Sequence, residues 1–416
     1  MPLSNAMATD SKGATLVVAA QNATSAERAA ADFVCDGVAD QVEINQAVSA
    51  LPAEGGSVRL TGGTFNTDDV IYVRRQDVAI HGSGVATLVQ GAGGAATHDV
   101  FYLGNGVDTY ANLALRHLKV APAVQRTTGG IGIHVDRCFK VWVEDVYIER
   151  QYRAIQLNNS TQVWLQNLPI RDTRENAITI EADFMDGFDW YLNNLVLDNP
   201  NVTNVGTGIA WYGGETLVMS GADIMRFRVG LDVNPGAGRE ARWAFIQNVI
   251  LDTCSDNGLH IGNTGSGNVT GLTFVNCWTS THANYGILID KNGTGYLEGI
   301  RFIGHKAFNN GLAGIALLGG SRITVSDSDI VSNSTSVPHT RAGIEVGAGV
   351  SYFSLLDCTC TNGYGHGDSQ ERGIKVNAGA SDYYRIVGCD LAGNYEANGL
   401  LDEGTGIHKV VANNLT

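Results

Sequence analysis

The residues best suited to chemistry lie close together near the middle of the chain. The run "NAITIEADFMDGFDWYLNN" (176–194) holds four carboxylates and four aromatic residues within 19 positions. Paired carboxyl groups can exchange protons with a glycosidic bond and its attacking water. Aromatic rings offer apolar faces on which other flat groups pack. The stretch is therefore a candidate site for a carbohydrate, provided that the surrounding elements bring these side chains together.

The stretch belongs to an internal repeat that predicts those elements. From about residue 131 a small–aliphatic–variable–apolar tetrapeptide recurs at spacings of 22 to 31 residues, and a second alternating run follows each copy after a short turn. The ten copies are GIHV (132–135), AIQL (154–157), AITI (177–180), GIAW (208–211), GLDV (230–233), GLHI (258–261), GILI (286–289), GIAL (314–317), GIEV (343–346) and GIKV (373–376). A fixed period of this length is typical of a solenoid.

Aligning the second runs reveals one column that contains only Asn, Asp or Gly. Its members are Asp145, Asn167, Asn194, Gly221, Asn248, Asn276, Gly304, Asp327, Asp357, Gly388 and Asn413. These residue types tolerate a left-handed backbone, so the column predicts a bend at the same corner of every lap. Laps that bury their apolar faces on one another, joined by right-handed crossovers, form a parallel β-helix. We predict an all-β, right-handed parallel β-helix of about 11–13 coils.

The N-terminal part fits the start of this solenoid. Within "DGVADQVEINQAVSAL" the apolar residues follow a helical stripe behind an acidic start, which predicts a capping helix over about 39–51. Residues 1–13 are expected to be a tail, and 14–416 a single β-helix domain with regular coils over about 131–416.

One segment carries a family resemblance. The run "CDGVADQVEINQAVSALPAEGGSVRLTGGTF" (35–65) resembles the opening segment of the pectate-lyase-like superfamily of right-handed β-helices. That superfamily contains polysaccharide lyases, glycoside hydrolases, epimerases, a fructotransferase group and trimeric bacteriophage tailspikes. The resemblance implies a polysaccharide substrate or receptor, and its tailspike members imply a homotrimer. No catalytic signature of the superfamily is recognisable. "GHG" (365–367) and "RGIK" (372–375) are similar to two motifs that its polygalacturonases carry far apart along the helix, but here only a few residues separate them.

Composition excludes several other classes. The formal charge of −15 argues against a nucleic-acid or anionic-membrane surface. No segment approaches the roughly 18–20 apolar residues of a membrane helix. The N-terminus lacks the basic region of a signal peptide, so we expect synthesis in the cytoplasm, followed by virion association or release by lysis. Seven scattered cysteines without CxxC predict no zinc or redox site, and Cys358 and Cys360 are expected to be buried. No cofactor is expected, with a cation such as calcium left open.

Ladder counting selects the candidate catalytic residues. In each tetrapeptide the third residue points outward, and a second outward row follows two positions later. Glu181 and Asp232 lie two laps apart, on the order of 10 Å between backbones, which side chains can close to an inverting separation. Asp183 and Asp186 are alternative partners, and His260 is placed to tune the pKa of Asp232 or to bind substrate. The residues expected to bind substrate are His134, Gln156, Tyr212, Asp186 and Glu215.

Three functions remain open at this point. The first is a glycoside hydrolase that resembles a tailspike depolymerase acting on bacterial surface glycan. The second is a polysaccharide lyase or epimerase, which needs a base such as His260 or Lys375 beside a cation that neutralises the substrate carboxylate. The third is a non-enzymatic spike that binds glycan and cleaves nothing.

Overall fold

The computed structural model describes residues 14–183, 186–202, 205–363 and 367–416. The predicted tail (1–13), part of the acidic turn after AITI and part of "GHG" lie outside these residues. The chain divides into two compact units, Met1–Arg174 and Glu175–Thr416, called unit 1 and unit 2 below.

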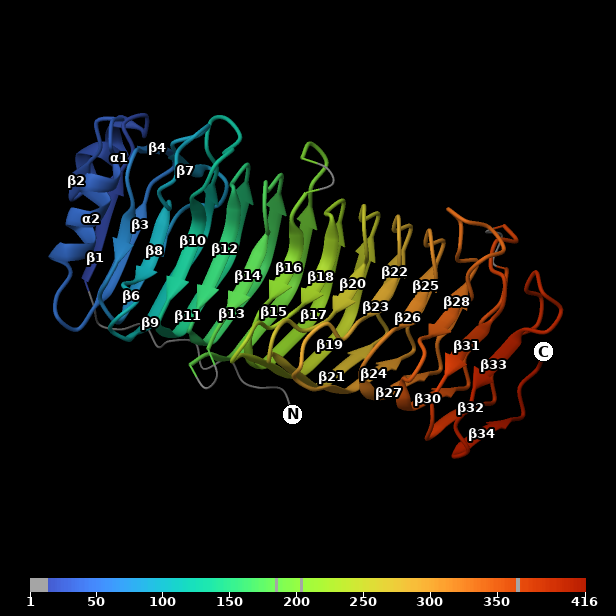
Figure 1. The fold of residues 1–416 in the computed structure, drawn as a ribbon. Coiled ribbons are helices and arrows are strands. Elements are labelled where there is room, and N and C mark those ends of the chain that lie inside the picture. Colours follow the sequence, from blue (N-terminus) through green and yellow to red (C-terminus); the bar gives the residue numbers. More distant parts are fainter. Residues whose placement is uncertain (1–13, 184–185, 203–204, 364–366) are drawn as a thin grey trace. The chain divides into compact units, whose positions relative to one another are not determined.

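Each unit is a stack of laps with parallel strand pairing, and the described residues of both units together make about 13 turns. A lap contributes one or two strands to one sheet, called sheet 1, and one strand to the other, called sheet 2. Within each unit, Figure 1 shows successive laps lying side by side. The predicted parallel β-helix is therefore confirmed.

Unit 1 contains the two helices and the first laps. The helices are α1 (Ser25–Ala30) and α2 (Gln41–Ala50). The strands of sheet 1 are β1 (Ala14–Ala19), β2 (Phe33–Val34), β3 (Gly56–Leu60), β4 (Gly63–Thr67), β6 (Val78–His81), β7 (Thr87–Gly91), β9 (Tyr110–Val120), β11 (Cys138–Glu149) and β13 (Thr161–Arg171). The strands of sheet 2 are β5 (Ile71–Val73), β8 (Phe101–Gly104), β10 (Ile131–Asp136) and β12 (Arg153–Asn158).

Unit 2 contains the remaining laps. The strands of sheet 1 are β15 (Phe188–Asp198), β17 (Gly214–Met225), β19 (Glu240–Asp252), β21 (Asn268–Val275), β22 (Trp278–Ser280), β24 (Leu297–Ile303), β25 (Lys306–Phe308), β27 (Ser321–Ser326), β28 (Asp329–Val331), β30 (Ser351–Leu356), β32 (Tyr384–Val387) and β34 (Lys409–Ala412). The strands of sheet 2 are β14 (Ile178–Glu181), β16 (Thr207–Trp211), β18 (Val229–Val233), β20 (Leu259–Ile261), β23 (Ile287–Ile289), β26 (Ile315–Leu317), β29 (Ile344–Val346), β31 (Ile374–Gly379) and β33 (Leu400–Gly404).

The predicted N-terminal helix is present as α2. Its apolar residues Ile44, Ala47 and Val48 are buried, as the helical stripe requires. The helix packs against strands of the first laps, among them β1 and β5. Its role as a cap on the core stays a prediction.

Apolar residues stack between laps to form the core. All ten tetrapeptides fall on strands of sheet 2, and their second residues align in register along each unit. In unit 2 this buried column includes Leu231, Leu259, Ile287, Ile315, Ile344 and Ile374. All seven cysteines are buried and free, which confirms the prediction for Cys358 and Cys360. Because each lap hides its apolar face on the next, the strands are rigid supports for outward side chains.

The predicted bend column is confirmed at every member. All eleven residues have φ between 52° and 73°. Some side chains also bond between laps, since the Asn167 amide donates to Asp145 at 2.9 Å. Left-handed residues also form a column near the start of the sheet 1 strands, before the predicted column in each lap. It is called the first bend column. Its members include Lys140, Gln162, Asp189, Thr216, Trp243, Gly271, Gly299, Arg322, Tyr352 and Tyr383.

Candidate active site

The outward row of sheet 2 has the predicted register but less exposure than expected. In unit 2, Ala210 pairs with Asp232, Asp232 with His260, and His260 with Leu288. Ala210 and Thr179 are nevertheless buried, and Asp232 is only 7 % exposed. An outward direction therefore does not make each of these residues available to a ligand.

Within this row the ring of His260 joins two carboxylates. Its Nδ1 lies 2.7 Å from Oδ1 of Asp232, and its Nε2 lies 2.8 Å from Oδ1 of Asp290. Asp232 is on β18, His260 on β20, and Asp290 directly follows β23, so three successive laps supply one residue each. Gly262 leaves room for this contact, because a Cβ there would lie 2.9 Å from both Nε2 of His260 and Oδ1 of Asp290.

The two carboxylates control the charge of the ring. Burial by itself lowers the pKa of His260, but the hydrogen bonds and negative charges of Asp232 and Asp290 outweigh burial and raise that pKa to about 9. Burial raises the pKa of Asp290, but its bond to His260 and the imidazolium charge hold that pKa below the usual value. At neutral pH the site is therefore an imidazolium held between carboxylates.

Asp232 and His260 form part of a polar groove in unit 2. The cavity has a volume of about 430 Å³. Its lining residues are Arg228, Val229, Asp232, Asn234, Asp256, Asn257, His260, Asn284, Tyr285 and Leu288. Amides, carboxylates and a guanidinium can all bond to sugar hydroxyl groups. The groove thus combines proton-transfer groups with hydrogen-bonding groups.

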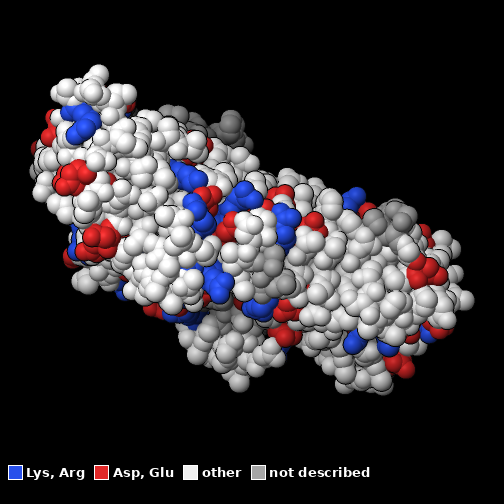
Figure 2. Space-filling model, turned by 90° about the horizontal axis from the view of Figure 1, so that it is seen from above, with Lys and Arg blue, Asp and Glu red and all other residues white. Residues whose placement is uncertain are grey.

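Two arginines at turns of unit 2 are paired with acidic side chains. Arg228 lies 3.1 Å from Asp256, which also accepts a hydrogen bond from Asn284 at 2.8 Å. Arg226 forms two bonds of 2.7 Å with Asp198. On the face shown in Figure 2, Lys and Arg side chains likewise lie among Asp and Glu side chains. The charge of Arg228 in the groove wall is therefore partly neutralised by Asp256.

The other carboxylates predicted to be catalytic form a separate cluster around Arg239. The guanidinium Nη1 lies 2.5 Å from Oε1 of Glu181, and its Nε lies 3.2 Å from Oδ1 of Asp183. Asp186 is exposed, and its backbone N–H donates to the carbonyl of Asp183 at 3.1 Å. The structure thus brings Asp232 to His260 and Glu181 to Asp183. The pairing of Glu181 with Asp232 stays a prediction.

The residues predicted to bind substrate are divided between different places. In unit 2, burial first and the charge of Asp232 second raise the pKa of Tyr212. Glu215 lies on sheet 1, where it pairs with Arg242, whereas the groove lies on sheet 2.

His134 and Gln156 belong to a cluster within unit 1. Nδ1 of His134 lies 2.8 Å from Asp99, and its Nε2 lies 3.0 Å from the amide of Asn158. Gln156 is buried and donates to Asn158 at 2.7 Å. The Tyr102 ring packs against His134 with centroids 4.6 Å apart. Their role in binding substrate stays a prediction.

Sequence reasoning missed Asp290 as a partner of His260, although Asp290 lies in the second outward row. It also missed the groove wall formed by Arg228, Asp256 and Asn284. Each of these three residues lies two positions before the first glycine of a tetrapeptide. That constant offset is the signal that could have found them.

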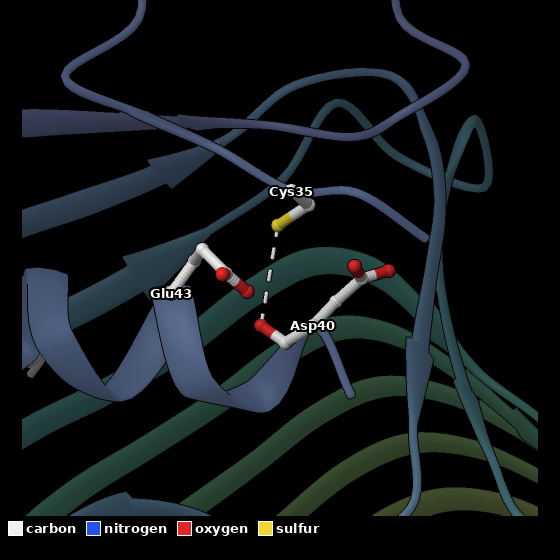
Figure 3. A group of neighbouring side chains, drawn as sticks. All are labelled: Cys35, Asp40 and Glu43. Carbon is white, nitrogen blue, oxygen red and sulfur yellow. Dashed lines mark hydrogen bonds between the residues drawn. The ribbon is translucent and has the colours of Figure 1, made fainter. Parts of the chain in front are cut away.

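One further group in unit 1 contains potential metal ligands. Atoms of Cys35, Asp40 and Glu43 lie within 4.8 Å of one another, and Figure 3 shows them at the start of α2. The Asp40 carboxylate already accepts backbone N–H bonds from Gly37 at 2.9 Å and Asn66 at 2.7 Å. Burial raises the pKa of the Cys35 thiol, which opposes the thiolate that a metal needs. We assign this group a structural role in the loop.

Comparison with known proteins identifies the fold. No family model matches the sequence, and no curated protein matches it. Among solved structures, a tailspike protein variant of E. coli bacteriophage HK620 in complex with a pentasaccharide is 14% identical, with a TM-score of 0.62 over 89% of this chain and 76% of that one. The fold resembles that of bacteriophage tailspikes.

Two further structures share this tailspike-like fold. DFA-IIIase from Arthrobacter chlorophenolicus A6, solved with DFA-III, is 12% identical with a TM-score of 0.56, over 82% of this chain and 94% of that one. The Dettilon tailspike protein is 13% identical with a TM-score of 0.52, over 89% of this chain and 65% of that one. The predicted resemblance to tailspike-containing β-helix proteins is thus confirmed for the fold. The long helix that a membrane span requires is not found among the described residues.

Proposed function

We propose that the chain binds a polysaccharide in the groove of unit 2 and hydrolyses it. The observation that carries this proposal is the imidazolium of His260 held between Asp232 and Asp290. The HK620 tailspike and DFA-IIIase, which share the fold, were solved with a pentasaccharide and with DFA-III. These complexes support a carbohydrate as the ligand of this chain.

The separation of the two carboxylates favours inversion. Hydrogen bonds of 2.7 and 2.8 Å on opposite sides of one imidazole ring put the two Oδ1 atoms roughly 7 Å apart, within the range of about 6.5–9.5 Å of inverting enzymes. Retaining enzymes hold their carboxyl groups closer together. The pair is therefore expected to invert the configuration of the sugar carbon.

The imidazolium of His260 supplies the acid proton through Asp232, and Asp290 acts as the base. Asp290, kept ionised by its low pKa, takes a proton from the attacking water. Asp232 receives a proton from Nδ1 of His260 and passes it to the oxygen of the leaving sugar. Asp290 then releases the gained proton to solvent, and Nδ1 of His260 takes up a proton from solvent. The C–O bond breaks, the water hydroxyl adds to the sugar carbon, and the three side chains return to their starting state.

Two alternatives have distinct requirements. Lyase or epimerase chemistry needs an unprotonated base, and a ring with a pKa of about 9 is already protonated at neutral pH. This charge disfavours His260 as that base. A non-enzymatic glycan-binding spike needs only the groove.

The catalytic pair and the biological setting are parts of the same proposal. The competing pair is Glu181 with Asp232, for which Asp183 and Asp186 are the alternative partners. The tailspike-like fold supports a phage tail component that assembles as a homotrimer and acts on bacterial surface glycan.

The test uses purified capsular polysaccharides and lipopolysaccharide O-chains. Wild-type protein is expected to release new reducing ends, with no absorbance from unsaturated uronates. Asp232→Asn and Asp290→Asn are expected to lose activity at least 100-fold. Asp357→Asn is the matched control, because Asn is also tolerated at that left-handed bend. Full activity in Asp290→Asn together with loss in Glu181→Gln would select the competing pair, and binding without products would exclude the enzyme.

A further inference from the structure

Sheet 1 of unit 2 carries an exposed aromatic pair away from the groove residues. Trp243 and Phe245 lie on β19, and their side chains are 50% and 57% exposed. Large apolar side chains exposed together are informative, because such patches often mark binding surfaces.

Trp243 lies over a strip without side chains. In the next two laps its aligned positions are Gly271 and Gly299, as the neighbouring pairs on β19, β21 and β24 require. A Cβ at Gly271 would lie 2.5 Å from Cε3 of Trp243, so only glycine lets the ring lie there. One side of the indole is thus supported by backbone while half of the side chain remains open to solvent.

The backbone at Trp243 is unfavourable for tryptophan. Its φ is 60°, in the left-handed region, where the next two laps use glycine. A bulky residue held there costs free energy relative to glycine. An exposed ring kept at a strained position is a reason to look for a function.

Hydrogen-bonding groups precede the two rings on the same strand, at Glu240 and Arg242 of β19. Arg242 pairs with Glu215 and lies 3.2 Å from Glu240. The carboxylate of Glu240 also accepts bonds from Tyr296 at 2.7 Å and Asn268 at 3.1 Å. An open aromatic face beside fixed carboxylate, guanidinium and amide groups is suited to a pyranose ring, which has apolar C–H faces and hydroxyl groups at its edge.

We propose that Trp243 and Phe245 form a second carbohydrate-binding platform, on sheet 1 of unit 2, that packs against pyranose rings of a polysaccharide. The platform acts as a binding site independently of the chemistry in the groove. A protein with both sites holds a long chain on one face while the groove residues act on another segment.

The test reads Trp243 directly. Protein labelled with 5-fluorotryptophan gives one ¹⁹F resonance for each of its six tryptophans, and Trp243→Gly identifies the resonance of Trp243 because glycine suits that backbone. Dextran, mannan, capsular polysaccharide and O-chain polysaccharide are titrated separately. The Trp243 resonance is expected to shift saturably with at least one of them, equally in wild type and in Asp232→Asn. Phe245→Ala is expected to raise the Kd read from that resonance at least fivefold.

Tyr352→Ala is the matched control. Tyr352 lies in the same bend column and is 52% exposed, but its ring is stacked on Tyr383 with centroids 4.8 Å apart. It is expected to leave the Kd within twofold of wild type. A Trp243 resonance that no polysaccharide moves overturns the proposal. A resonance that moves when the protein alone is diluted also overturns it, because a second copy of the chain then covers the ring.

Discussion

Replacing Asp290 by Asn tests the electrostatics of the groove quantitatively. The variant keeps the shape of the side chain but removes one of the two charges that face His260. An opposite charge at hydrogen-bond distance raises a histidine pKa by about 1–3 units. The pKa of His260, about 9 in the wild type, is therefore expected to fall to roughly 6–8 in Asp290→Asn. That shift corresponds to about 1.4–4 kcal/mol of differential interaction with the imidazolium.

The assay is an NMR titration of the imidazole Cε1–H of His260 from pH 5 to 10, which needs no substrate. The raised pKa also has a consequence for stability. The contact stabilises the fold fully below the unfolded pKa, near 6.5, and this stabilisation is lost as pH rises through about 9. Asp290→Asn is thus expected to show a smaller loss of urea resistance between pH 7 and 10. A wild-type ring that titrates near 6.5 would refute the reasoning.

Three further changes probe the site and its scaffold. Gly262→Ala places a Cβ 2.9 Å from both Nε2 of His260 and Oδ1 of Asp290, so it should lower both the activity and the pKa of His260. The control Gly236→Ala, with open space around it, should change neither. Burial lowers the pKa of His282 and His305 to about 3, so between pH 6.5 and 3 each ring binds a proton only in the unfolded chain. Each ring should therefore lower the free energy of unfolding by about 1.4 kcal/mol per pH unit as pH falls over this range. A urea midpoint that stays constant over this range would contradict this prediction. Asn276→Ala should cost about 1–2 kcal/mol of unfolding free energy while Asn276→Gly is nearly neutral, because φ there is 52°; equal urea midpoints for both would contradict the bend assignment.

The sequence predicted the scaffold well because the scaffold is periodic. Alternation in the tetrapeptides predicted the outward row, and the column of Asn, Asp and Gly predicted the bend that includes Asn276. The first bend column stayed hidden, because its left-handed positions carry residues such as Lys140, Gln162 and Tyr352. Those types do not signal a left-handed backbone, and the neighbouring laps impose the conformation there.

The site was predicted only where it lies on the periodic rows. Asp232 and His260 were placed correctly as neighbours, since strand register follows from the repeat. Their third partner, Asp290, lies just beyond a strand, where spacing gives direction but not which side chains meet. The groove wall at Arg228 and Asp256 comes from turns, whose path depends on packing between laps. Glu181 pairs with Arg239, which lies in another turn. Counting ladder positions does not predict contacts between turns.

The most direct test of the central claim is the release of reducing ends from purified bacterial surface polysaccharides by wild type and Asp232→Asn. Wild type is expected to release products whose new reducing end has the anomeric configuration opposite to that of the cleaved bond. Asp232→Asn is expected to bind the polysaccharide but to release products at least 100-fold more slowly. Equal rates for the two proteins would contradict the claim that the carboxylates joined by His260 perform the reaction.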